Sequence, residues 1–148
     1  MHKTWAAYKA GFSDALGNFW IGNDNLHRLT KDGQCTAHFD GWVSDSDNEW
    51  LWAEYLQFSI SNEATSYILG YKAYIGGSLP IDGLLLSRGC SFSTFDRGSL
   101  TVCAITVRGG FWYSGCARTC MTGYGITLRI CGEFCYILKF TRITLLCG

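Results

Sequence analysis

The chain has 148 residues, is poor in proline and carries no excess of either charge. One proline stands against eighteen glycines, and twelve basic residues balance twelve acidic ones. A neutral chain lacks the basic surface that draws proteins to phosphates, so we do not expect nucleic acid as a partner. With 48% hydrophobic and 16% charged residues, the chain is no disordered tail, and its length suits one domain.

A membrane span and an export signal are both missing from the sequence. The hydrophobic segment after Ile126 is interrupted by Arg129, Glu133 and Lys139, whereas a span needs about 20 nearly uncharged residues. The first nine residues contain no apolar run of the kind that a signal peptide has. We therefore expect no membrane span, and no leader within this chain.

Motifs for catalysis are lacking as well. The histidines are His2, His27 and His38, and none lies in a His-Glu-x-x-His motif. There is no Gly-x-Ser-x-Gly elbow and no glycine-rich phosphate loop ending in Lys-Ser/Thr. The sequence therefore predicts a protein that is not an enzyme.

Cysteine, by contrast, is abundant, with eight residues. No Cys-x-x-Cys occurs, and the even count with scattered positions favours disulfides over metal ligation. Zinc remains an alternative, because Cys116 and Cys120, like Cys131 and Cys135, are separated by three residues.

Helical periodicity is clearest near the N-terminus. Trp5, Tyr8 and Phe12 recur at spacings of three and four, which predicts a helix from Trp5 to Leu16 with these side chains on one face. The polar run that starts at Asn23 predicts the beginning of a second helix, which continues through Leu29.

Strand patterns dominate the middle of the chain. Residues 34–39, 52–60 and 67–71 are rich in β-forming side chains, with a turn expected at 62–64. In 52–60 the alternation places Ala53, Tyr55 and Gln57 on one face, opposite Trp52, Leu56, Phe58 and Ile60. Glycines become frequent from Gly76 onward, which indicates a loop-rich stretch.

Several segments together resemble a known family. They are Trp5–Phe12, Gly17–Thr30, Ala53–Tyr55 with Phe58, Phe92–Arg97, Cys103–Ala104 and Gly109–Cys116. In this order they resemble the motifs of the fibrinogen C-terminal domain over residues 5–125. The resemblance implies a secreted, extracellular protein.

The fold implied is a partial α+β fibrinogen C-terminal domain, with a twisted antiparallel sheet, short helices and a loop-rich distal lobe. The central sheet would occupy residues 1–73 and the distal lobe 74–125, followed by a divergent tail at 126–148. The family's N-terminal subdomain would precede Trp5, and its oligomerisation segments also lie upstream of this chain. The β-rich segment 137–146 is a candidate to replace the family's last strand.

The resemblance also implies roles for individual residues in the distal lobe. Cys103 and Cys116 would form the family's disulfide, and the peptide bond between Gly115 and Cys116 would be the one that is often cis. The other cysteines would be unpaired or mispaired extras: Cys35, Cys90, Cys120, Cys131, Cys135 and Cys147.

A calcium site and a ligand pocket are implied in the same lobe. Asp96 matches the first calcium-binding aspartate of the family, but Gly98 replaces the second, which would weaken the site. By position, the residues at the pocket are Val107, Tyr113, Gly115, Cys116 and Ala117. The aromatic residues 111–113 fit either a pocket wall or, preferably, the core.

The first functional hypothesis is a recognition module that binds acetylated carbohydrate in the manner of a defence lectin. The alternative is a protein-interaction module of an extracellular matrix or signalling protein, without affinity for sugar. A third reading is a gene fragment without function of its own.

Overall fold

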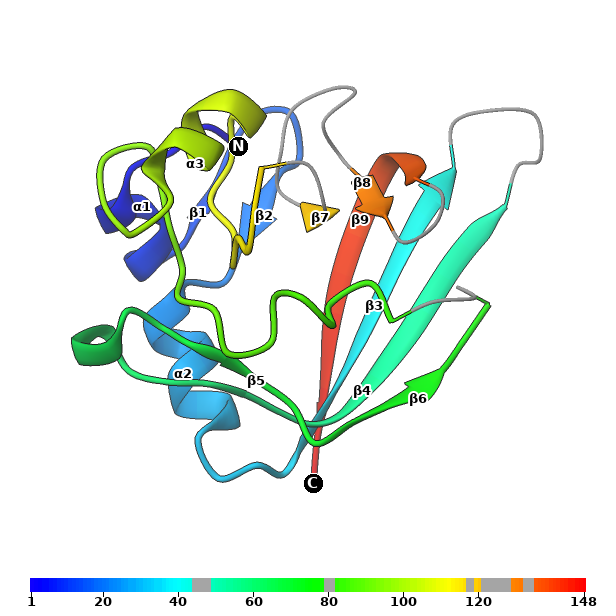
Figure 1. Ribbon diagram of the computed structural model, residues 1–148. Coiled ribbons are helices and arrows are strands. Elements are labelled where there is room, and N and C mark those ends of the chain that lie inside the picture. The colour runs from blue at the N-terminus through cyan, green and yellow to red at the C-terminus, as the bar shows by residue number, and fades with distance from the viewer. Residues whose placement is uncertain (44–48, 79–81, 117–118, 121–128, 132–134) are drawn as a thin grey trace.

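The computed structural model (Figure 1) describes residues 1–43, 49–78, 82–116, 119–120, 129–131 and 135–148. Its helices are α1 (Trp5–Ala10), α2 (Asn23–Thr30) and α3 (Thr101–Val107), with a 3-10 turn η1 (Glu63–Thr65). Its strands are β1 (Phe12–Ser13), β2 (Phe19–Trp20), β3 (Cys35–Val43), β4 (Trp50–Ile60), β5 (Leu69–Gly70), β6 (Ala73–Gly76), β7 (Thr119–Cys120), β8 (Arg129–Cys131) and β9 (Cys135–Cys147). The predicted α+β class is confirmed.

One antiparallel sheet forms the framework of the molecule, in the order β5-β4-β3-β9-β8-β7, with β6 also pairing with β4. The strands β1 and β2 form a separate small hairpin. In Figure 1 the helices α1, α2 and α3 all lie to the left of the long strands β3, β4 and β9. The helices therefore cover one side of the long strands.

Helix α1 begins where the Thr4 hydroxyl accepts a hydrogen bond from the N–H of Ala7, which caps the first turn. It ends at Gly11, whose φ of 94° favours glycine. A Cβ on Gly11 would lie 2.8 Å from the carbonyl oxygen of Trp20, so the chain passes too close to the hairpin for a side chain. The predicted helix from Trp5 to Leu16 is therefore wrong beyond Ala10.

Strand β4 follows the predicted alternation only in its first half. Tyr55 faces the core, but Gln57 adopts a left-handed conformation (φ 49°), after which Phe58 and Ile60 are buried instead. The register with β3 slips at the same place. This bulge puts Tyr55 and Phe58 on the same side, which a strict period of two cannot predict.

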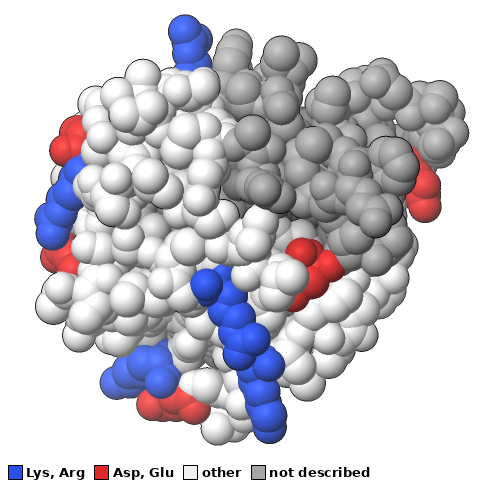
Figure 2. Space-filling view, in the orientation of Figure 1, with Lys and Arg blue, Asp and Glu red and all other residues white. Residues whose placement is uncertain are grey.

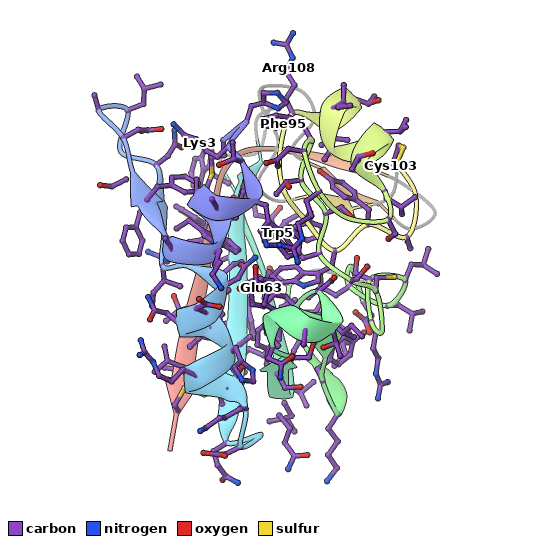
Figure 3. All side chains as sticks on the ribbon, turned by 90° about the vertical axis from the view of Figure 1, so that its left-hand side faces the viewer. Lys3, Trp5, Glu63, Phe95, Cys103 and Arg108 are labelled. Carbon is purple, nitrogen blue, oxygen red and sulfur yellow. A yellow bond between two sulfur atoms is a disulfide. The ribbon has the colours of Figure 1, made fainter. Side chains whose placement is uncertain are left out.

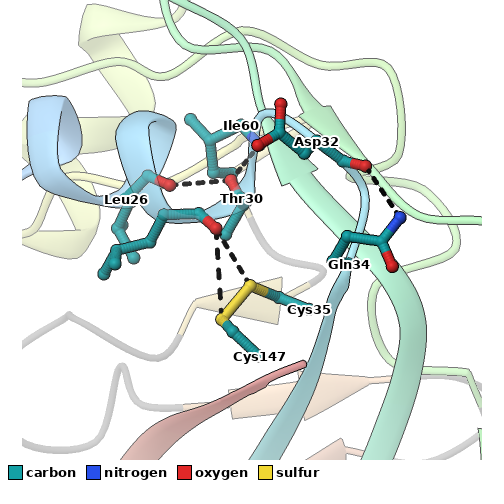
Figure 4. Close-up of a disulfide and its surroundings, with 8 residues drawn as sticks. Leu26, Thr30, Asp32, Gln34, Cys35, Ile60 and Cys147 are labelled. Atoms are coloured by element: carbon teal, nitrogen blue, oxygen red, sulfur yellow. Dashed lines mark hydrogen bonds between the residues drawn. A yellow bond between two sulfur atoms is a disulfide. The ribbon is translucent and has the colours of Figure 1, made fainter.

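The C-terminal segment forms strand β9, which pairs with β3 along nearly the whole length of that strand. The prediction that residues 137–146 form a strand is confirmed. In this register Cys35 lies opposite Cys147, and the two form a disulfide (Figure 4) with their Cα atoms 4.1 Å apart. The expectation that Cys35 and Cys147 are unpaired or mispaired extras was wrong, because the pairing of β9 with β3 brings these two cysteines together.

The core lies between the helices and the inner face of the sheet, and it is rich in aromatic rings. Tyr8, Trp20, Phe92 and Trp112 are buried, and their ring centroids lie 5.1–6.3 Å apart in the neighbouring pairs. Trp20 donates from Nε1 to the buried Asn23 of α2 at 3.0 Å. Segments far apart in the sequence therefore share one core.

The described stretch between β6 and α3 consists mostly of turns and bends, in agreement with the glycine-rich sequence. The predicted strand at 67–71 shortens to β5 because Tyr67 adopts a left-handed conformation (φ 54°). Among the described residues, no helix has the length and apolar character needed to cross a bilayer.

Candidate ligand-binding lobe

Helix α3 and the Cys103–Cys116 disulfide frame the distal lobe (Figure 3). Cys103 is buried in the helix, whereas Cys116 is exposed, and their Cα atoms lie 4.5 Å apart. A bond that closes this short loop stabilises the fold by about 3 kcal/mol, because it restricts the unfolded chain. The peptide bond between Gly115 and Cys116 is not cis, and neither is any other among the described residues.

The floor of the lobe is made by Phe111, Trp112 and Tyr113, all buried. The backbone of Phe111 pairs with Ser93 in an isolated antiparallel bridge, and Trp112 donates from Nε1 to the carbonyl of Tyr67 at 2.7 Å. The interpretation of this aromatic trio as core is confirmed. The trio joins the lobe to the rest of the domain.

Gly110 lies where the lobe meets α1. Its N–H donates to the hydroxyl of Tyr8 at 3.0 Å, within the core. A Cβ at this position would come within 2.8 Å of the rings of Tyr8 and Phe92. Only glycine therefore fits this junction without displacing a buried ring.

The residues that the resemblance places at the pocket take different positions in the structure. They are Val107 and Tyr113, both buried, Gly115, half-buried, Cys116, exposed, and Ala117, which lies outside the described residues. Tyr113 donates its hydroxyl hydrogen to the carbonyl of Gly109. The side chains of Val107 and Tyr113 face the core. The role of these five residues at a ligand pocket stays a prediction.

Asp96 lies in the loop where the resemblance implies calcium. Its Oδ1 accepts hydrogen bonds from the N–H of Trp5 at 2.9 Å and from the hydroxyl of Thr94 at 2.7 Å. Partial burial raises the pKa of this carboxyl, but the hydrogen bonds from Thr94, Trp5 and its own backbone, together with the charge of Arg97, outweigh burial and leave the pKa below its usual range. The carboxylate thus anchors the first turn of α1 to the lobe.

Gly98, where the family has its second calcium-binding aspartate, has a φ of 120°. A Cβ there would lie 2.7 Å from the Cα and 2.5 Å from the Oγ of Ser93. The loop therefore has no room for an aspartate at this position in its present shape.

Glu63 at the start of η1 receives donors from two other segments, helix α1 and the loop that holds Arg97. Its Oε1 accepts from Trp5 Nε1 at 2.9 Å and from Arg97 at 3.1 Å, and its Oε2 pairs with Lys9. The bond from Lys9, followed by that from Trp5, lowers the pKa of the Glu63 carboxyl. The guanidinium of Arg97 also lies 4.4 Å from the centroid of the Trp5 ring. We call these four residues the Glu63 network; Figure 3 labels two of them, Trp5 and Glu63.

The outer face of α3 carries two exposed apolar side chains next to the exposed Thr106. Val102 is 67% exposed and Ile105 is 55% exposed, at a spacing of three that puts them on the same side of the helix. The inner face buries Cys103, Ala104 and Val107. Large apolar side chains exposed side by side on a helix make this outer face a candidate contact surface.

Sequence reasoning missed both the Glu63 network and α3. The sequence predicts only a turn at 62–64 around Glu63, since nothing local in its sequence indicates its three partners, which are distant in the chain. The spacing of Val102, Cys103 and Val107 is that of a short helix and offered a signal for α3, but the abundance of glycine around it concealed the pattern.

The alternative of a zinc site loses one ligand, because Cys116 is bonded to Cys103. The side chains of Cys120, Cys131 and Cys135 lie outside the described part of the structure. Within the described part, Cys90 has a free thiol. On the face that Figure 2 shows, the described Lys and Arg side chains lie in a few separate groups.

The chain is similar to known proteins over most of its length. The family model for the C-terminal globular domain of fibrinogen beta and gamma chains matches residues 1–131, so the match extends past residue 125, where the sequence resemblance was expected to end. Ryncolin-4 of Cerberus rynchops is 36% identical over 125 residues, which are 82% of this chain and 35% of ryncolin-4. The chain thus spans about a third of that relative.

Solved structures show the same architecture. The fibrinogen-like globe domain of human ANGPTL6 matches with a TM-score of 0.77 and 26% identity, over 97% of this chain and 70% of that domain. The lamprey fibrin D-dimer, complexed with the peptide ligand Gly-His-Arg-Pro-amide, matches with a TM-score of 0.63 and 25% identity, over 84% of this chain and 44% of the fibrin chain.

Proposed function

Because this chain belongs to the fibrinogen C-terminal domain family, a family of non-enzymatic interaction modules, we propose that it is an extracellular module that binds a protein or peptide through the outer face of α3. The observation that carries this proposal is the exposure of Val102 and Ile105 beside the Cys103–Cys116 bond. Apolar side chains on a short, disulfide-tied helix suit contact with a protein surface. The peptide ligand of the lamprey fibrin structure supports this class of partner.

Binding of acetylated carbohydrate in this lobe is the competing function. An acetyl group needs an apolar wall for its methyl and donors for its carbonyl. Two residues at the family's pocket positions, Val107 and Tyr113, have buried side chains, and the hydroxyl of Tyr113 is bonded to the carbonyl of Gly109. The described residues therefore favour protein recognition over acetyl recognition.

We also propose that the lobe keeps its shape without calcium. The carboxylate of Asp96 is engaged by Trp5 and Thr94, and Gly98 cannot be replaced by a ligand without displacing Ser93. Arg97 follows Asp96 in this loop and forms an ion pair with Glu63, so the loop carries a positive charge next to the expected calcium ligand. Calcium ligands must converge on one point with several oxygens, and this donor set does not fit that requirement.

The test compares the wild-type protein with Ile105→Asp and with Leu16→Asp, a control at a residue 85% exposed on the β1–β2 hairpin loop. Surface plasmon resonance against Gly-His-Arg-Pro-amide and a panel of extracellular matrix proteins should show binding that Ile105→Asp weakens by at least about tenfold and Leu16→Asp leaves unchanged. Retention on N-acetylglucosamine resin, with elution by the free sugar, would instead support the lectin-like function. Retention abolished by chelation would contradict the proposal of calcium independence.

A further inference from the structure

The outer face of the long strands, away from the helices, has an unusual composition. Successive outward positions of β3 carry His38, Asp40 and Trp42, because alternate residues of a strand point to the same face. In register, Trp52 of β4 and Arg142 of β9 both lie opposite Asp40, and Trp50 lies opposite Trp42. We call these six residues the tryptophan face.

Two indoles on this face are open to solvent and held in place by neighbours. Trp50 is 42% exposed and Trp52 is 39% exposed. Trp52 stacks on His38 with ring centroids 5.4 Å apart, and Trp50 packs edge-on against Trp42 at the same separation. Large aromatic rings bury much apolar area when covered, so ordered and exposed indoles provide a preorganised contact surface.

The polar groups of the face have partners on the same side of the sheet. Arg142 donates to Oδ2 of Asp40 from Nη2 at 2.8 Å and from Nε at 3.2 Å. Nδ1 of His38 lies 3.0 Å from a carboxylate oxygen of Glu54, the residue opposite it on β4. Because these charges already have partners within the face, a neutral ligand suits it better than an ionic one.

Asp40 supplies a second, independent observation. Its residue is 6% exposed, and its Oδ1 has no hydrogen-bond partner in the described structure. A buried acceptor without a donor is unfavourable, so a ligand hydroxyl that reaches it would be bound more strongly than one at an exposed carboxylate. The other oxygen, Oδ2, is held by Arg142 at 2.8 Å and lies 3.4 Å from Nε2 of His38, so a ligand hydroxyl at Oδ1 would complete the coordination of this carboxylate.

We propose that the tryptophan face binds a flat, neutral, β-linked oligosaccharide. Equatorial pyranose rings present apolar C–H faces that lie flat on indoles, while their hydroxyls hydrogen-bond to carboxylate and guanidinium groups. A β-1,4-linked chain is an extended ribbon, which matches the open surface of a sheet, whereas an α-1,4-linked chain curves away from it. This site is separate from α3, so it does not depend on the function proposed for the distal lobe.

The test follows the indole N–H signals of the 15N-labelled protein by NMR. The chain has six tryptophans, and Trp50→Phe and Trp52→Phe identify two of the six signals by their disappearance. Titration with cellohexaose should shift the signals of Trp50 and Trp52 and leave those of the buried Trp5 and Trp112 in place.

Maltohexaose, of the same composition but α-linked, is the matched control and should bind at least about tenfold more weakly. Trp52→Ala should weaken cellohexaose binding by a similar factor, while Ile105→Asp on α3 should not change it. Absence of shifts at millimolar cellohexaose would overturn the proposal. So would shifts of the same two signals that follow protein concentration alone, because they would assign the face to self-association.

Discussion

Removal of the Cys35–Cys147 disulfide tests the placement of β9 most directly. The bond joins residues 112 apart, so the entropy of the closed loop predicts a loss of about 4.8 kcal/mol at 25 °C when both cysteines are replaced. The same relation gives about 2.9 kcal/mol for Cys103–Cys116, which are 13 apart. Serine is the suitable replacement, because Sγ of Cys35 lies 3.0 Å from the carbonyl of Leu29, to which a hydroxyl could donate.

The assay is equilibrium unfolding in urea of Cys35→Ser/Cys147→Ser and of Cys103→Ser/Cys116→Ser, with Cys90→Ser as the free-thiol control. The long-loop variant should lose more stability and show a steeper dependence on urea, since its unfolded chain is more expanded. A larger loss in the short-loop variant, or an unfolding midpoint of the long-loop variant equal to wild type, would refute the pairing of β9 with β3.

Three further changes test the lobe. Gly98→Asp should destabilise the domain by about 1–3 kcal/mol through the contact with Ser93, and calorimetry should detect no gain in calcium binding. The pKa of Glu63 is lower in the folded state than in the unfolded chain, where it is about 4.3. The ionised carboxylate therefore stabilises the fold above that pH, and this stability is lost as the pH falls through the folded-state pKa. Thermal unfolding of Glu63→Gln should accordingly show a shallower loss of stability below about pH 4 than the wild type. Gly110→Ala should cost about 1–3 kcal/mol in urea unfolding, because its methyl meets the ring of Phe92, and an unchanged midpoint would contradict this packing.

The sequence predicted elements whose cause is local. The periodicity of Trp5 and Tyr8 predicted the buried face of α1, and the polar start at Asn23 predicted α2. Where an element depends on a distant segment, prediction failed. Helix α1 ends early because Gly11 lies against the β1–β2 hairpin, and that contact is invisible in the neighbourhood of Gly11 alone.

The same reasoning explains the cysteines. Cys103 and Cys116 could be paired through the family resemblance, because both lie in a motif. Cys35 and Cys147 meet only through the register of β9 on β3, in which a slip of one residue would turn the two side chains to opposite faces. Their pairing is thus a property of the sheet.

Helix α3 shows how the phase of a helix divides neighbouring residues between the core and the surface. Val107 occupies a pocket position by resemblance, yet the turn of α3 that buries Cys103 and Ala104 also directs Val107 into the core. The same helical phase turns Val102 and Ile105 to solvent. Because residues three or four apart share a helix face, a change of side chain at Val107 would alter the packing beneath the lobe, while a change at Ile105 would alter what the lobe meets. The contact surface that we propose on this lobe therefore depends on the phase of a seven-residue helix that a disulfide ties to the following loop.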